Sequence, residues 1–99
     1  MKVLLVCAAG MSTSILMKKL EKYAEEQGIE FSISATGWAN AKDACGGVDC
    51  VLMGPQVAYQ KANVEAMVGG IPVAVIPPQD YGMGNCKSIF DLIDELLGK

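Results

Sequence analysis

Apolar runs alternate with amphipathic stretches along this chain, which predicts strands alternating with helices. Residues 2–6 and 48–53 are almost wholly apolar, as expected of strands buried on both faces. Residues 29–36 alternate apolar and polar side chains, which favours an edge strand with one wet face. Residues 71–76 form a fourth apolar run with Pro72 near its start, which an edge also tolerates. Strands interleaved with helices favour a parallel sheet.

Four helices are predicted between and after these strands, and they cover residues 13–27, 40–45, 57–68 and 85–97. The apolar side chains of the first helix recur with the helical period and form one stripe: Leu16, Leu20, Tyr23 and Ala24. Its basic side chains are expected to face water: Lys18, Lys19 and Lys22. Gly28 follows as a left-handed stop. The last helix carries an equivalent apolar stripe: Ile89, Ile93, Leu96 and Leu97.

Right-handed crossovers between these strands fit the sheet order 2-1-3-4, with the two most apolar strands in the centre. The expected fold is therefore a three-layer, doubly wound α/β domain with a four-stranded parallel sheet, and residues 1–99 form one domain. The first and third strands then lie side by side, so the loops over residues 7–13 and 54–56 flank one crevice. Ligands of open α/β sheets bind in such a crevice, at the carboxyl ends of the strands.

Composition narrows the classes of function. The chain has a net charge of −3 and no basic patch, which argues against a nucleic-acid partner. Its apolar runs fall well short of the roughly 20 residues that span a bilayer, so a cytoplasmic protein is expected. A monomer is also expected. Four cysteines without a CxxC pair indicate reduced thiols. The chain has no His and no Arg, which excludes His-assisted nucleophiles, His-ligated metals and guanidinium clamps. No metal or cofactor is predicted.

The candidate chemistry lies at the end of the first strand, where Cys7 is followed by small and hydroxyl residues and then by a helix. These residues are Ala8, Ala9, Gly10, Met11, Ser12, Thr13 and Ser14. Main-chain N–H groups ahead of a helix N-terminus form a site for an anion such as phosphate. We therefore predict that Cys7 takes up a phosphoryl group in this loop. The plainer alternative is an ordinary strand-to-helix turn with a buried cysteine and a Ser or Thr cap.

Three activities are compatible with such a loop. A cysteine phosphatase or arsenate reductase of this topology uses an Arg where this chain has Thr13, and a lost charged donor costs about 2.7–4 kcal/mol of transition-state stabilisation. Asp80 stands where a phosphatase has its general acid. A phosphoryl carrier tolerates the missing Arg, because its partners supply the groups. An anion-binding regulatory module is the non-enzymatic alternative. Cys45, Cys50 and Cys86 are expected to be small apolar core residues.

The segment from Cys7 to Ser14, together with Gly54-Pro55-Gln56-Val57-Ala58-Tyr59 and Tyr81-Gly82, resembles the IIB components of the bacterial sugar phosphotransferase system, lactose/cellobiose/chitobiose type. The resemblance covers the whole chain, and one departure is Ala8, where the family more often has Ser. It implies a four-stranded parallel sheet similar to that of low-molecular-weight tyrosine phosphatases. It also implies a relay in which phosphohistidine on a IIA protein donates to Cys7.

The resemblance further implies that the phosphocysteine passes its group to a sugar of the β-glucoside or disaccharide class in the membrane transporter IIC, with which the protein associates transiently. Three more residues are candidates for contacts around the phosphate or with a partner: Gln56, Tyr81 and Asp80. Gln56 is expected to reach a phosphate or partner across the crevice, and Tyr81 to shield the phosphocysteine. An ionised Asp80 would repel a dianion, so it is expected to turn away or to contact a partner.

Overall fold

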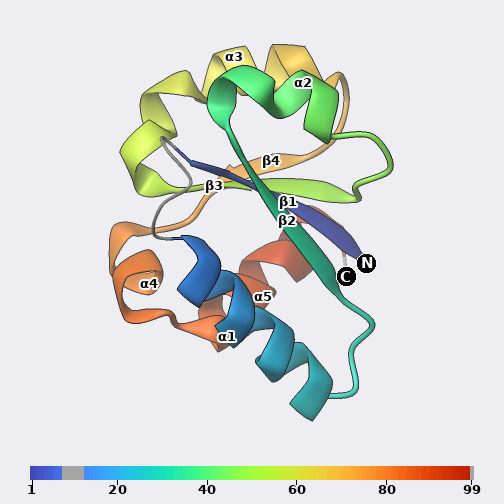
Figure 1. The fold of residues 1–99 in the computed structure, drawn as a ribbon, viewed down its shortest axis with the longest axis vertical. Coiled ribbons are helices and arrows are strands. Elements are labelled where there is room, and N and C mark those ends of the chain that lie inside the picture. Colours follow the sequence, from blue (N-terminus) through green and yellow to red (C-terminus); the bar gives the residue numbers. More distant parts are fainter. Residues whose placement is uncertain (8–12, 99) are drawn as a thin grey trace.

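Four parallel strands form the central sheet of the computed structural model, which describes residues 1–7 and 13–98. The strands are β1 (Lys2–Cys7), β2 (Ser32–Gly37), β3 (Cys50–Met53) and β4 (Val73–Val75). Their order is β2-β1-β3-β4, as predicted, with β1 and β3 in the centre (Figure 1). Each pair runs parallel, with Val6 opposite Thr36 on β2 and opposite Met53 on β3.

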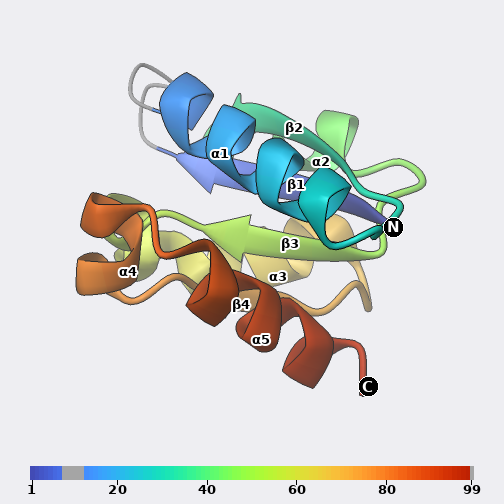
Figure 2. The same ribbon diagram turned by 90° about the horizontal axis from the view of Figure 1, so that it is seen from below.

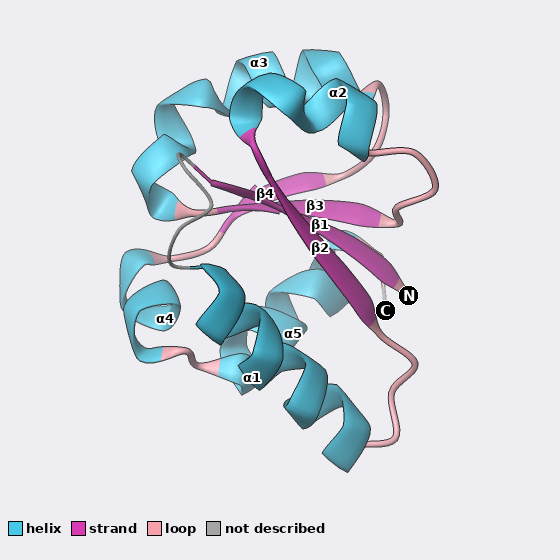
Figure 3. Ribbon diagram, viewed as in Figure 1, coloured by secondary structure: helices cyan, strands magenta, loops and turns pink. Residues whose placement is uncertain are grey.

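Helices cover both faces of this sheet and complete the three layers (Figure 3). The α-helices are α1 (Thr13–Glu26), α2 (Ala41–Ala44), α3 (Lys61–Val68), α4 (Pro78–Met83) and α5 (Cys86–Leu96). Two 3₁₀ segments, η1 (Trp38–Asn40) and η2 (Pro55–Gln60), precede α2 and α3. Helices α2 and α3 lie on one face, whereas α1, α4 and α5 lie on the other (Figures 1 and 2).

The core is divided by the sheet into two apolar clusters because side chains alternate along each strand. Val3 and Leu5 of β1 pack with Leu20 of α1 and with α5. Leu4 and Val6 face the other way and pack beneath α2 and α3. The almost wholly apolar sequence of β1 is thus explained by burial on both faces. Side chains from the helices pack against β1 on each side of the sheet.

Helix α4 was not predicted from the sequence, because Pro77-Pro78 indicated only the end of a strand. Pro78 instead occupies the first turn of α4, where a proline loses no hydrogen bond because that N–H has no helical partner. The helix ends at Gly84, whose φ of +63° is a left-handed stop. The structure thus has five α-helices among its described residues, one more than expected.

The predicted second, third and fourth strands are longer than the observed ones; the fourth was expected over residues 71–76 and covers only Val73–Val75. Residues 29–31 do not join β2, because the Ile29 N–H closes the end of α1 by donating to the carbonyl of Ala24 at 2.8 Å. Ahead of β3, the Val48 N–H bonds back to the Cys45 carbonyl in a turn. The predicted helix over residues 57–68 begins as the 3₁₀ segment η2 and becomes α-helical only at Lys61. Within the described ranges, no helix has the length and apolarity needed to cross a bilayer.

Candidate functional site

Cys7 is the last residue of β1, at the carboxyl edge of the sheet. The alternation of side chains places it on the same face as Val3 and Leu5, the face covered by α1, α4 and α5. Cys7 is only 4% exposed, and its Sγ donates a hydrogen bond to the main-chain carbonyl of Thr36 on β2 at 3.6 Å. The thiol is therefore held beside the edge strand β2 by a weak hydrogen bond.

Both neighbours of Cys7 in the sheet are glycines. Gly37 on β2 pairs directly with Cys7. On the other side, the Gly54 N–H donates to the Val6 carbonyl at 2.8 Å and extends the register that pairs Val6 with Met53. Gly54 therefore lies next to Cys7, one position beyond the paired residues Val6 and Met53. Neither neighbour carries a side chain, so the sheet itself leaves the flanks of the thiol unfilled.

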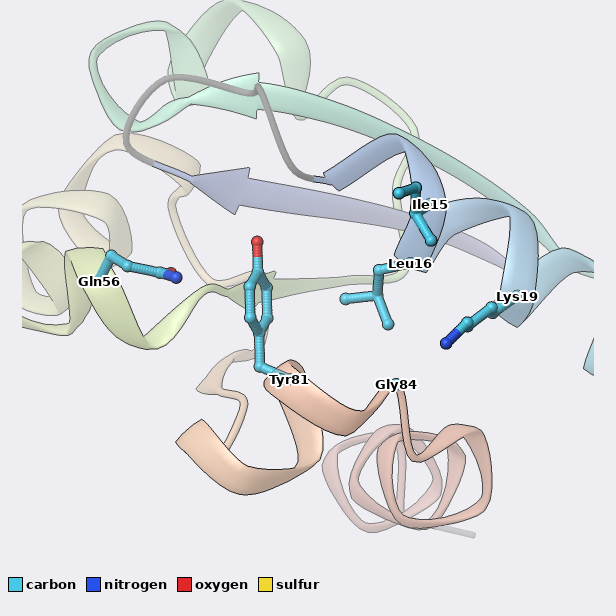
Figure 4. A pocket seen from close by; sticks show the side chains of 7 residues that line it. Ile15, Leu16, Lys19, Gln56, Tyr81 and Gly84 are labelled. Carbon is cyan, nitrogen blue, oxygen red and sulfur yellow. The ribbon is translucent and has the colours of Figure 1, made fainter.

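A pocket of about 330 Å³ opens on this face of the sheet (Figure 4). It is lined by Ile15, Leu16 and Lys19 of α1, by Gln56, and by Tyr81, Gly82 and Gly84 of the α4 segment. In Figure 4 the Tyr81 side chain points its hydroxyl from α4 toward β1, and the Gln56 carboxamide points at the Tyr81 ring. The structure thus brings together two predicted candidates that lie far apart in the sequence.

Asp80 does not line this pocket, although it precedes Tyr81. Its Oδ1 accepts a hydrogen bond from Asn85 Nδ2 at 3.4 Å, and its main-chain carbonyl accepts one from the Asn85 N–H at 3.0 Å. Asp80 lies in the first turn of α4, and its carboxylate links that helix to Asn85 at the start of α5. Among the described residues, neither Cys7 nor a carboxylate lines this pocket.

The predicted phosphate loop is described only in part. Ala8, Ala9, Gly10, Met11 and Ser12 lie outside the described residues. Thr13 begins α1, and Ser14 is exposed in its first turn. That first turn holds no acidic side chain, so the positive end of the helix dipole is not neutralised by the helix itself.

Lys19 is a pocket residue that the sequence analysis treated only as part of a solvated helix face. It is exposed, as expected, yet its stem lies over Gly84: a Cβ added at Gly84 would meet Lys19 Cδ at 2.9 Å. Its spacing from Ile15 is i, i+4, which places the two on neighbouring turns of one face. That spacing was a usable signal, but only the unpredicted helix α4 shows that the face closes a pocket.

Two of the other three cysteines, Cys50 and Cys86, have thiols whose pKa is raised. Burial, together with the nearby charge of Asp49, raises the pKa of the Cys50 thiol to about 11. Burial also raises the pKa of Cys86, although Lys19 opposes that shift. Cys45 Sγ donates to the carbonyl of Lys42 at 3.2 Å. Cys50 is a core residue as predicted, whereas Cys45 and Cys86 are only half-buried. Among the described residues, no cluster of three or more potential ligands could hold a metal ion.

Residues 2–92 match the family model described as PTS system, Lactose/Cellobiose specific IIB subunit. The galactose-specific EIIB component of the PTS system from Lactococcus lactis subsp. cremoris (strain MG1363) is 43% identical over 100 residues, covering 94% of this chain and 93% of the relative. The cellobiose-specific EIIB component from Lactococcus lactis subsp. lactis (strain IL1403) is 42% identical with the same coverage. The solution structure of the cellobiose-specific phosphotransferase IIB component protein from Borrelia burgdorferi has a TM-score of 0.80 at 35% identity, covering 99% of this chain and 92% of that one.

Proposed function

The chain belongs to the lactose/cellobiose-specific IIB family of the phosphotransferase system, and from that premise we propose that it carries a phosphoryl group on Cys7. In this proposal a phosphohistidine on a IIA protein is the donor. A sugar bound by the membrane transporter IIC is the acceptor. The protein acts as a monomer on the cytoplasmic side and meets the transporter only transiently.

The placement of Cys7 is the observation that carries this proposal. It lies at the carboxyl end of a central strand, between the two glycines Gly37 and Gly54, and on the face that holds the pocket. Ligands of open α/β sheets bind at this edge. The thiols of Cys45, Cys50 and Cys86 lie elsewhere: in a helix-end turn, inside β3, and at the start of α5.

Two displacements at phosphorus make up the reaction. In the first, the sulfur of Cys7 attacks the phosphorus of the donor; the N–P bond breaks, an S–P bond forms, and the thiol proton passes to the imidazole nitrogen that leaves. In the second, a sugar hydroxyl attacks the same phosphorus; the S–P bond breaks, an O–P bond forms, and the hydroxyl proton returns to the thiolate. No metal or cofactor enters either step.

The chain's own contribution is to hold the phosphoryl group between these steps. We propose that main-chain N–H groups from Ala8, Ala9, Gly10, Met11 and Ser12 bind the phosphoryl oxygens, together with Thr13 and Ser14 at the start of α1. Gln56 and Tyr81 line the pocket on the same face of the sheet, which supports the proposal that they contact the group or the partner that delivers it. Asp80 is not assigned a role in this step; its carboxylate accepts a hydrogen bond from Asn85.

The sugar is proposed at the level of a class. Relatives named for galactose and for cellobiose are almost equally similar to this chain, at 43% and 42% identity. We therefore propose a β-glucoside or related disaccharide of the lactose/cellobiose class and leave the choice within that class to the membrane partner.

One labelling experiment tests the carrier role. The chain is incubated with a phosphorylated IIA protein of this family, and an iodine-labile phosphothiol is sought. We expect one label per chain, lost in Cys7→Ser and retained in Cys45→Ser, which removes a half-buried thiol away from the pocket. Label that persists in Cys7→Ser, or rapid turnover of p-nitrophenyl phosphate by the unmodified chain, would contradict the proposal and favour a phosphatase.

A further inference from the structure

Position 54, which lies beside Cys7, is occupied by a glycine although its backbone conformation does not require one. Its φ of −65° and ψ of 148° are extended values that any residue adopts, so no special glycine conformation is needed there. It is nevertheless buried at the carboxyl edge of the sheet, where larger apolar residues fill the preceding strand. The absence of a side chain at this position must therefore be explained by space.

The atoms around Gly54 show what occupies that space. A Cβ added there would lie 2.9 Å from Gln56 Oε1, closer than a side-chain carbon normally approaches. It would also lie 3.4 and 3.6 Å from two carbons of the Tyr81 ring. The Gln56 carboxamide thus occupies the niche that a larger residue at position 54 would fill, and Figure 4 shows it directed at Tyr81.

We propose that Gly54 is a positioning residue for phosphoryl transfer, because its missing side chain lets the Gln56 carboxamide lie beside Cys7. Register neighbours in a parallel sheet point to the same face, so a side chain at position 54 would project next to the Cys7 side chain. This inference rests on the carrier function proposed above. It adds a defined role for Gln56: its Oε1 lies in the niche, and the amide N–H groups on the other side of the same carboxamide are the proposed donors to a phosphoryl oxygen.

The position of the Gln56 carboxamide depends on the space beside Gly54. Gln56 is solvent-exposed as a residue, so the hydrophobic core does not fix its side chain. The contact with Gly54 is made by the far end of a flexible side chain, so an added methyl group can push it aside without disturbing the sheet. Gly54→Ala is therefore a mild change to the fold and a direct change to the position of the carboxamide.

A double-mutant cycle tests this coupling. The rate of Cys7 phosphorylation by phosphorylated IIA is measured at saturating donor for the wild type, Gly54→Ala, Gln56→Ala and the double variant. Each single variant is expected to be slower by about tenfold to a hundredfold, the loss expected for one hydrogen bond to a charged group. KM for the donor protein should change little. The double variant should be no slower than either single variant, because both remove the same interaction.

The control variant is Gly46→Ala, since Gly46 has open space around it and no left-handed φ. It should retain the wild-type rate, and thermal unfolding should show all four variants folded. If Gly54→Ala fails to fold, Gln56→Ala alone must still show the full loss. A wild-type rate in Gln56→Ala, or losses that multiply in the double variant, would overturn the inference. Either result leaves the carrier proposal intact, which fails only if wild-type Cys7 accepts no phosphate.

Discussion

Cys50 provides a quantitative test of how burial in the sheet changes the pKa of a thiol. It is fully buried in β3, and its pKa is raised from an ordinary value of 9.0 to about 11, mainly by desolvation and to a lesser extent by the charge of Asp49. The folded chain therefore keeps this thiol protonated at pH values where the unfolded chain releases the proton. That difference links the free energy of unfolding to pH.

The sign and size follow from the two pKa values. Below pH 9 the thiol is protonated in both states, so its full contribution to stability is present. Between pH 9 and 11 only the unfolded chain ionises at Cys50, and this favours unfolding progressively. A difference of two pKa units corresponds to about 3 kcal/mol at most. This is a large fraction of the roughly 5–15 kcal/mol that stabilises a domain of this kind.

The assay compares the wild type with Cys50→Ala by urea unfolding at pH 8, 9, 10 and 11 under reducing conditions. Other groups titrate in both proteins and cancel in the difference. We expect the advantage of the wild type over the variant to shrink by about 2 kcal/mol between pH 8 and pH 11, since the full difference is reached only above the folded pKa. Val51→Ala, a neighbouring buried position without a titratable group, should show a constant difference. A constant difference for Cys50→Ala as well would refute the claim that burial holds this thiol protonated.

Two further predictions concern the elements that build the site. Leu20→Ala removes a fully buried side chain of α1 from the cluster it forms with β1 and α5, and should cost about 2–5 kcal/mol in urea unfolding; an unchanged midpoint would contradict the docking of α1. Asn85→Ala removes the side-chain acceptor of the Ser88 N–H at the start of α5 and should cost about 1 kcal/mol, a fall in Tm of about 4–8 °C. Ser88→Ala keeps that N–H and serves as its control.

The alternation of apolar and polar segments was sufficient to predict the sheet. Two wholly apolar strands are compatible only with burial on both faces, and right-handed crossovers then leave few strand orders. The order β2-β1-β3-β4 and the placement of Cys7 at the carboxyl edge followed directly from the sequence. Strand ends were less predictable, because Ile29 is apolar like a strand residue yet closes the end of α1 through its N–H.

The sequence by itself determined the fold class, the family and the identity of the candidate nucleophile, because each depends on local pattern: apolar periodicity and a thiol followed by small residues. Only the tertiary structure decided what surrounds that thiol. Helix α4 was not predicted, because the pair Pro77-Pro78 is compatible with the first turn of a helix as well as with the end of a strand. The approach of Tyr81 to Gly54, and of Lys19 to Gly84, depends on how that helix packs. Such contacts join residues far apart in the chain, and no local pattern encodes them.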